Sequence, residues 1–157
     1  MYTPLYVKTN YSLLSSLVTI DGLMELCKKY NLKSIAICDD DMTSTMVFYK
    51  ECIKNGIKPV IGLEIKIDGL SILLYAMNYN GYQNLIKLST KKYEKELDIN
   101  DLKERNNDLI CIIPFESRTK YDELEKVYDE LYVGYQNKFE EEEVKKYTKK
   151  VVFLNKI

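Results

Sequence analysis

The fold is decided by two stretches of this 157-residue chain, IAICDDD at residues 35–41 and GIKPVIGLE at residues 56–64. The first is a short apolar run that ends in three carboxylates, as expected of a buried strand that leads into a loop. The second starts with a glycine that can end a helix and continues as a β-rich run. Because residues 43–55 between them have a helical pattern, the two stretches predict a strand-helix-strand unit. Its acidic side chains fall at the carboxyl ends of the strands, where parallel α/β folds place their sites.

The rest of the chain continues this alternation around one Asp-Gly hairpin signal at residues 68–69. Strands are expected at residues 5–8, 34–38, 59–67, 70–77, 109–113, 131–135 and 151–154. Helices are expected from a cap at Thr19 or Asp21, and at residues 81–93, 99–105, 118–128 and 139–149. Six or seven strands alternating with helices predict the α/β class, as a β/α barrel or a related layered fold. The length indicates a single domain over residues 1–157.

Apolar spacing also predicts which helix faces are buried. The inward side chains are expected to be Leu23, Leu26, Cys27 and Tyr30 in the first helix, Met46, Val47, Tyr49 and Ile53 in the second, and Leu85, Ile86 and Leu88 in the third. The helix at residues 139–149 begins with glutamates and ends with lysines, which predicts Glu141–Lys145 and Glu142–Lys146 pairs on a solvated surface. A docking patch is the functional alternative for that charge run.

Composition limits the classes of partner. Lys and Arg number 23 against 24 Asp and Glu, so no global field draws the chain to nucleic acid or to a membrane. Basic and aromatic groups that could still contact phosphates and bases are Lys8, Lys87, Lys91, Lys92 and Tyr93, but without a net basic charge solvated helix faces are the favoured explanation. No apolar run or signal pattern suggests membrane insertion or export, so a cytoplasmic protein is expected. Reduced, buried thiols are expected at Cys27, Cys38, Cys52 and Cys111.

The acidic run offers one possible site. Asp39, Asp40 and Asp41 together with Glu64 could place oxygen ligands for Mg²⁺ or Mn²⁺ in one mouth of the fold, whereas Zn²⁺ would find no imidazole, because the chain has no histidine. Alternatively, the three aspartates simply form a turn and cap the next helix. No glycine-rich phosphate loop is present. The serines at positions 12, 15 and 16 have no base nearby in sequence, so turn and cap roles are expected for them.

Three segments carry a resemblance to a known family: YVKTNYSLL at residues 6–14, IAICDD at residues 35–40 and FYKECIKNGIKPVIGLE at residues 48–64. They resemble the opening of the polymerase-and-histidinol-phosphatase (PHP) domain. Within that superfamily they are similar to the N-terminal part of bacterial DNA polymerase III alpha subunits, as are residues 74–76 and 81–89. The resemblance implies a distorted seven-stranded β/α barrel, here incomplete at its C-terminus, with palm, fingers and thumb outside the chain. Active members carry a metal cluster at the strand ends for phosphoester hydrolysis or proofreading.

The chain departs from the family at the positions of the metal ligands. The family's first motif, His-x-His followed by Thr, is represented by Tyr6-Val7-Lys8 before Thr9, so a phenol and a cation replace two ligands. The second motif, an acidic residue and a frequent histidine, falls on Asp39 and Asp40. Glu64 matches the family's ligand in Gly-x-Glu. The expected ammonium of Lys8 would stand roughly where a metal ion sits, paired with Glu64 or Asp39.

The resemblance therefore implies a degenerate site without catalytic residues, in which Tyr6, Lys8, Asp39, Asp40 and Glu64 mark vacated metal positions. No cofactor is expected, apart from weak Mg²⁺ or Mn²⁺ binding by the three carboxylates. The implied partners are the rest of a polymerase alpha subunit and a proofreading exonuclease or other replisome subunits, with no evident DNA or membrane contact. The alternative is a stand-alone phosphoesterase that uses Asp39, Asp40 and Glu64 with a divalent metal.

Overall fold

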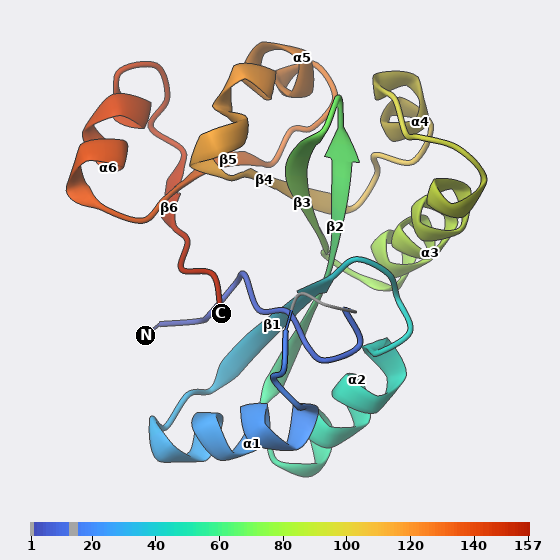
Figure 1. Cartoon of the computed structure of the whole chain (residues 1–157), viewed down its shortest axis with the longest axis vertical. Helices are drawn as coiled ribbons and strands as arrows, with labels where there is room; N and C mark the ends of the chain where they lie inside the picture. Colours follow the sequence, from blue (N-terminus) through green and yellow to red (C-terminus); the bar gives the residue numbers. More distant parts are fainter. Residues whose placement is uncertain (1, 13–15) are drawn as a thin grey trace.

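The computed structural model describes residues 2–12 and 16–157 and contains one curled sheet of six strands, which confirms the α/β class (Figure 1). The strands follow chain order across the sheet: β1 (Ser34–Asp39), β2 (Lys58–Ile67), β3 (Leu70–Ala76), β4 (Leu109–Ile113), β5 (Leu131–Tyr135) and β6 (Val151–Phe153). β3 is antiparallel to both of its neighbours, and the other neighbours are parallel. Five strands therefore end at the same mouth of the curled sheet.

The helices lie around the outside of the sheet (Figure 1). They are α1 (Ile20–Lys29), α2 (Thr45–Lys54), α3 (Tyr79–Glu94), α4 (Ile99–Glu104), the 3-10 helix η1 (Phe115–Lys120), α5 (Tyr121–Glu125) and α6 (Lys138–Lys145). The expected single helix at residues 118–128 is wrong, because the chain first makes a tight turn in which Ser117 N–H donates to the carbonyl of Pro114 at 2.8 Å. No helix in the described part of the chain is both long and apolar enough to cross a membrane.

The two outer strands of the sheet are connected through the N-terminal segment, residues 4–8. Where a strand is expected, the structure has a single parallel bridge between Tyr6 and Lys156. Main-chain hydrogen bonds of 2.7 to 3.1 Å hold the segment between β1 and the end of the chain: Ile157 N–H to Tyr6 O, Lys8 N–H to Ile157 O, Ala36 N–H to Pro4 O and Cys38 N–H to Val7 O. The segment thus brings its side chains to the mouth formed by the strand ends.

Core side chains form three clusters, one inside the curl and two beneath the helices. The inner cluster contains Tyr6, Ala36, Cys38, Leu73, Tyr75, Ile112 and Leu154. Because side chains alternate along β2, Leu63 and Ile65 pack outward while Glu64 faces the inner cluster. The four cysteines are buried and free, as the reduced-thiol prediction requires.

The predicted inward face of α2 is wrong. Met46, Val47, Tyr49 and Ile53 are 45–56% exposed, and the helix instead buries Thr45, Phe48 and Cys52. Both stripes have helical spacing, so periodicity alone could not select the one that contains the large ring of Phe48. Ile86 of α3 and Tyr30 after α1 are likewise exposed, against expectation.

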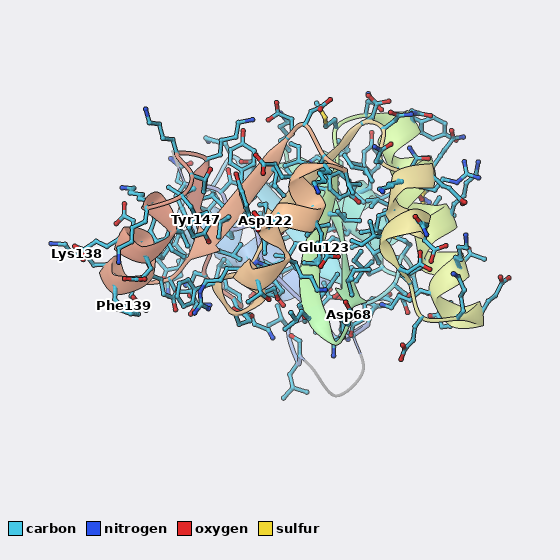
Figure 2. All side chains as sticks on the ribbon, turned by 90° about the horizontal axis from the view of Figure 1, so that it is seen from above. Asp68, Asp122, Glu123, Lys138, Phe139 and Tyr147 are labelled. Atoms are coloured by element: carbon cyan, nitrogen blue, oxygen red, sulfur yellow. The ribbon has the colours of Figure 1, made fainter. Side chains whose placement is uncertain are left out.

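Two groups of ion pairs lie on the outer surface near α5 and α6, and Figure 2 labels Asp68 and Glu123, the acidic residues of the first group. Lys120 contacts Asp68 in the β2–β3 turn and Glu123 in α5, the latter at 3.2 Å, and so links the hairpin to the helix layer. On α6 the predicted Glu141–Lys145 pair is present. The predicted Glu142–Lys146 pair is wrong, because Lys146 binds Glu143 one turn away at 2.7 Å.

Candidate functional site

The structure brings the five residues singled out from the sequence to one mouth of the sheet. Tyr6 and Lys8 come from the N-terminal segment, Asp39 and Asp40 from the end of β1, and Glu64 from β2. The parallel register pairs Asp39, the last residue of β1, with Leu63, so the residues that follow them in the chain, Asp40 and Glu64, lie close to the same level. The N-terminal segment runs beside β1 and adds its two side chains to this pair.

Lys8 is the centre of the cluster. Its Nζ lies 2.6 Å from Oδ1 of Asp40 and also contacts Oε2 of Glu64. The side chains of Lys8 and Glu64 are only 4% and 6% exposed, whereas that of Asp40 is 44% exposed. The expected contact with Glu64 is present, and the second carboxylate is that of Asp40. Asp39 was the alternative partner expected for Lys8, but its side-chain oxygens accept hydrogen bonds from other groups.

The second oxygen of Glu64 accepts a hydrogen bond from the hydroxyl of Tyr6. Burial by itself raises the pKa of Glu64, but the hydrogen bonds from Lys8 and Tyr6 and the charge of Lys8 prevail and lower the pKa to about 2. For Lys8, burial lowers the pKa, yet the bonds to Asp40 and Glu64 outweigh it and raise the pKa. Burial and the bond to Glu64 raise the pKa of Tyr6. At neutral pH the cluster is therefore an ion pair with a neutral phenol beside it.

Asp39 connects three segments of the chain. It is 1% exposed, and its two oxygens accept hydrogen bonds of 2.6 to 2.7 Å from Thr9 N–H, Thr9 Oγ1, Ser12 Oγ and Ser44 Oγ. These bonds fix the N-terminal loop and the start of α2 to the end of β1. The sequence identified Asp39 as a candidate but did not identify its hydroxyl partners, because their approach depends on the path of two loops.

The serines expected in turns are found there where the structure describes them. Ser12 donates to Asp39 and accepts from the N–H of Asp40 at 3.2 Å. Ser16 accepts from the N–H of Val18 at 3.0 Å. Ser15 lies outside the described residues, as do Leu13 and Leu14 of the first motif.

Lys92 of α3 is a member of the site that the sequence did not assign to it. Its Nζ donates to the main-chain carbonyls of Asp40 and Glu64, the latter at 3.2 Å. Burial lowers the pKa of Lys92, although the negative charges of the Asp40 and Glu64 side chains raise it. The neighbouring Lys91 and Tyr93 have other partners, Asp101 at 2.7 Å and Asp41 at 3.0 Å. The lysines of α3 therefore do not form one continuous basic face.

The side chains as arranged do not fit a divalent cation. Each oxygen of Asp39 already accepts hydrogen bonds, and both oxygens of Glu64 are engaged. The ammonium of Lys8 lies between Asp40 and Glu64, where its charge would repel a metal ion. Among the described residues, no group of three or more histidine, cysteine, aspartate or glutamate side chains is arranged to hold a metal.

A family model described as the PHP domain matches residues 4–154, which include all five residues of the cluster. The chain belongs to the PHP domain family. Among curated proteins, this PHP domain is similar to the DNA polymerase III subunit alpha of Halalkalibacterium halodurans, at 35% identity over 71% of the chain. It is also similar to the alpha subunits of Streptococcus pyogenes serotype M3 and Borreliella burgdorferi, each at 34% identity, over 73% and 68% of the chain. It spans only 11–12% of the length of these relatives.

Among solved structures, the PHP domain is similar to part of a two-domain Bacteroides vulgatus protein described as containing a predicted PHP-like metal-dependent phosphoesterase. The TM-score is 0.57 over 84% of this chain and 43% of that chain, at 12% sequence identity. At this identity the likeness concerns the fold alone, and it agrees with the curled sheet described above. The PHP resemblance of residues 6–14, 35–40 and 48–64 is thus confirmed at the level of family and fold.

Proposed function

We propose that this PHP domain is part of a replicative DNA polymerase III alpha subunit and serves there as a metal-free structural and interaction module. The observation that carries the proposal is the buried ammonium of Lys8, held by both Asp40 and Glu64. A fixed internal cation offsets negative charge at these carboxylates without a metal, and its removal would leave Glu64 buried without its cation. The similarity to alpha subunits supports the replicative role.

Metal titration tests the metal-free state. Isothermal titration of the purified chain with Mn²⁺ and with Zn²⁺ should give no tight stoichiometric binding, and p-nitrophenyl phosphate should not be hydrolysed in the presence of either metal. In Lys8→Met, Asp40 and Glu64 face each other without the ammonium, so Mn²⁺ should now raise the melting temperature. The matched control is Lys103→Met on the exposed surface of α4, which should respond to Mn²⁺ as the unmodified chain does.

A second candidate function is a divalent-metal phosphoesterase that uses Asp39, Asp40 and Glu64. The half-exposed side chain of Asp40 favours it, because a substrate phosphate could reach that carboxylate at the mouth. Tight stoichiometric Mn²⁺ or Zn²⁺ binding together with phosphatase turnover by the unmodified chain would establish this function and exclude the metal-free proposal.

The coding region tests the replicative assignment separately. An open frame that continues past codon 157 and encodes a polymerase palm with its acidic triad is the expected result. A stop codon at that point would contradict the assignment. In the polymerase setting we expect a cytoplasmic protein whose partners are the remaining domains of the alpha subunit and a proofreading exonuclease or other replisome subunits.

A further inference from the structure

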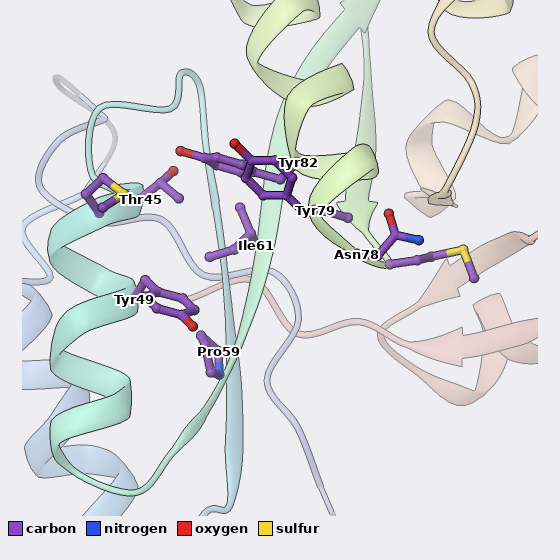
Figure 3. A pocket seen from close by; sticks show the side chains of 10 residues that line it. Thr45, Tyr49, Pro59, Ile61, Asn78, Tyr79 and Tyr82 are labelled. Atoms are coloured by element: carbon purple, nitrogen blue, oxygen red, sulfur yellow. The ribbon is translucent and has the colours of Figure 1, made fainter.

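A hollow on the surface lies away from the Lys8 cluster, over the outer face of β2. Its volume is about 420 Å³, and its walls come from the first turns of α2 and α3 (Figure 3). The floor is formed by Pro59 and Ile61, which point to the opposite side of β2 from Glu64. Tyr49 and Tyr82 stand on its two sides (Figure 3). The lining is almost entirely apolar.

Both helices extend this hollow into longer apolar stripes. On α2 the exposed residues Met46, Tyr49 and Ile53 follow the i, i+3, i+7 spacing. On α3 the residues at the same spacing are Tyr79, Tyr82 and Ile86. This is the spacing with which one helix packs against another. Sequence periodicity assigns several of these side chains to a core, yet no described segment of the chain covers them.

The charges around the hollow favour an acidic occupant. Lys50 and Lys54 of α2 and Lys87 of α3, the two helices that form the walls, are all exposed. None of these three lysines makes a salt bridge with another residue that the structure describes. The only acid on α2 is Glu51. Two copies of the chain joined symmetrically at this face would bring lysines against lysines, which argues against self-association here.

We propose that this surface, the α2–α3 groove, binds one amphipathic helix of a partner protein, with apolar side chains in the hollow and acidic side chains against the lysines. Met46 and Met77, exposed at its edges, have the flexible thioether side chains that adapt to helical ligands. The groove and the Lys8 cluster occupy opposite faces of β2. The proposal therefore does not depend on whether the cluster binds metal.

A peptide titration tests the groove directly. The probe is a helical peptide with leucine at heptad positions a and d, glutamate at the surface positions and one tryptophan. Because the chain contains no tryptophan, selective excitation reports only the peptide. We expect saturable binding with a blue shift, about tenfold tighter than for the same peptide with lysine in place of glutamate. Equal binding of both peptides, or no binding of the acidic one, would overturn the proposal.

Two variants test whether the acidic peptide binds at the α2–α3 groove. Tyr49→Ala should weaken the acidic peptide about tenfold, as expected for an aromatic anchor, and Lys50→Glu should weaken it at low salt. Their matched controls are Tyr30→Ala and Lys103→Glu, both at exposed positions outside the groove, and neither should change the affinity. Circular dichroism melts establish that each variant is folded. Affinity that is unchanged in Tyr49→Ala and Lys50→Glu would exclude the groove as the site.

Binding of either of two other occupants at the groove would also overturn the proposal. A labelled oligothymidylate that binds the chain, and loses affinity in Tyr49→Ala, would indicate a single-stranded nucleic acid site. A dimer in analytical ultracentrifugation that dissociates in Tyr49→Ala would indicate that a second copy covers the groove. We expect a monomer and no oligothymidylate binding at this face.

Discussion

Lys8 and Glu64 form a buried ion pair across the mouth of the curled sheet, and Tyr6 completes it from the same segment as Lys8. Breaking such a pair from one side leaves the other charge buried and uncompensated, which typically costs about 3–5 kcal/mol. Lys8→Met should therefore lower the free energy of unfolding by that amount in urea denaturation. The double variant Lys8→Met/Glu64→Gln should recover much of the loss. If the loss in free energy of unfolding in the double variant equalled the sum of the losses in the two single variants, the two side chains would not be coupled.

Acid stability should depend on Glu64. Its pKa of about 2 in the folded chain lies below its ordinary value of 4.5, so the unfolded chain binds this proton first as the pH falls. The ion pair thus contributes on the order of 3 kcal/mol to the free energy of unfolding. This contribution is fully present above pH about 4.5 and is lost as the pH falls towards about 2. Glu64→Gln should be less stable at pH 7 but lose less over that interval in urea titrations. Glu96→Gln, at an exposed position, should keep the profile of the unmodified chain.

Asp39→Asn should loosen the N-terminal loop. One side-chain oxygen becomes an amide N–H₂ group, which cannot accept the bonds that Thr9, Ser12 or Ser44 donate. We expect a loss of about 2–4 kcal/mol, because buried donors are left without acceptors. Hydrogen exchange should become faster at the amide of Thr9. The control Asp129→Asn, on the exposed surface, should leave both quantities unchanged, and equal effects of the two substitutions would contradict the role given to Asp39.

Gly81→Ala distinguishes helix propensity from packing. Alanine in α3 should favour the helix by about 1 kcal/mol on propensity alone. However, a Cβ at this position would lie 2.2 Å from the carbonyl oxygen of Asp108, a main-chain atom that cannot move aside easily. We therefore expect a lower melting temperature. Gly22→Ala in α1 is the comparison, because its Cβ would meet only the side-chain oxygen of Thr19 at 3.1 Å. A higher melting temperature for Gly81→Ala would refute the packing argument.

The sequence was most informative where local chemistry dictates local structure. The turn between β2 and β3 is an example, since Asp68 and Gly69 both have positive φ angles, 53° and 78°, as the Asp-Gly hairpin signal requires. It was least informative for α2, where two apolar stripes compete and only tertiary packing selects Phe48 for the core. The contact of Lys8 with Glu64 was expected from aligned motifs. The bonds of Lys92 to the carbonyls of Asp40 and Glu64 were not, because they depend on how α3 lies against the strand ends.

The bridge between Tyr6 and Lys156 has a consequence for biogenesis. The ribosome makes the segment of residues 4–8 before the strands of the sheet, but Lys156 and Ile157, which also pair with it, only after every strand has been made. Contacts between distant parts of a chain form slowly, and the sheet exposes apolar surface until these contacts have formed. During synthesis, the main-chain N–H of Lys8 should therefore lack its acceptor, the carbonyl of Ile157, until residue 157 has been made. The polar cluster at the mouth would then be among the last parts of this domain to mature.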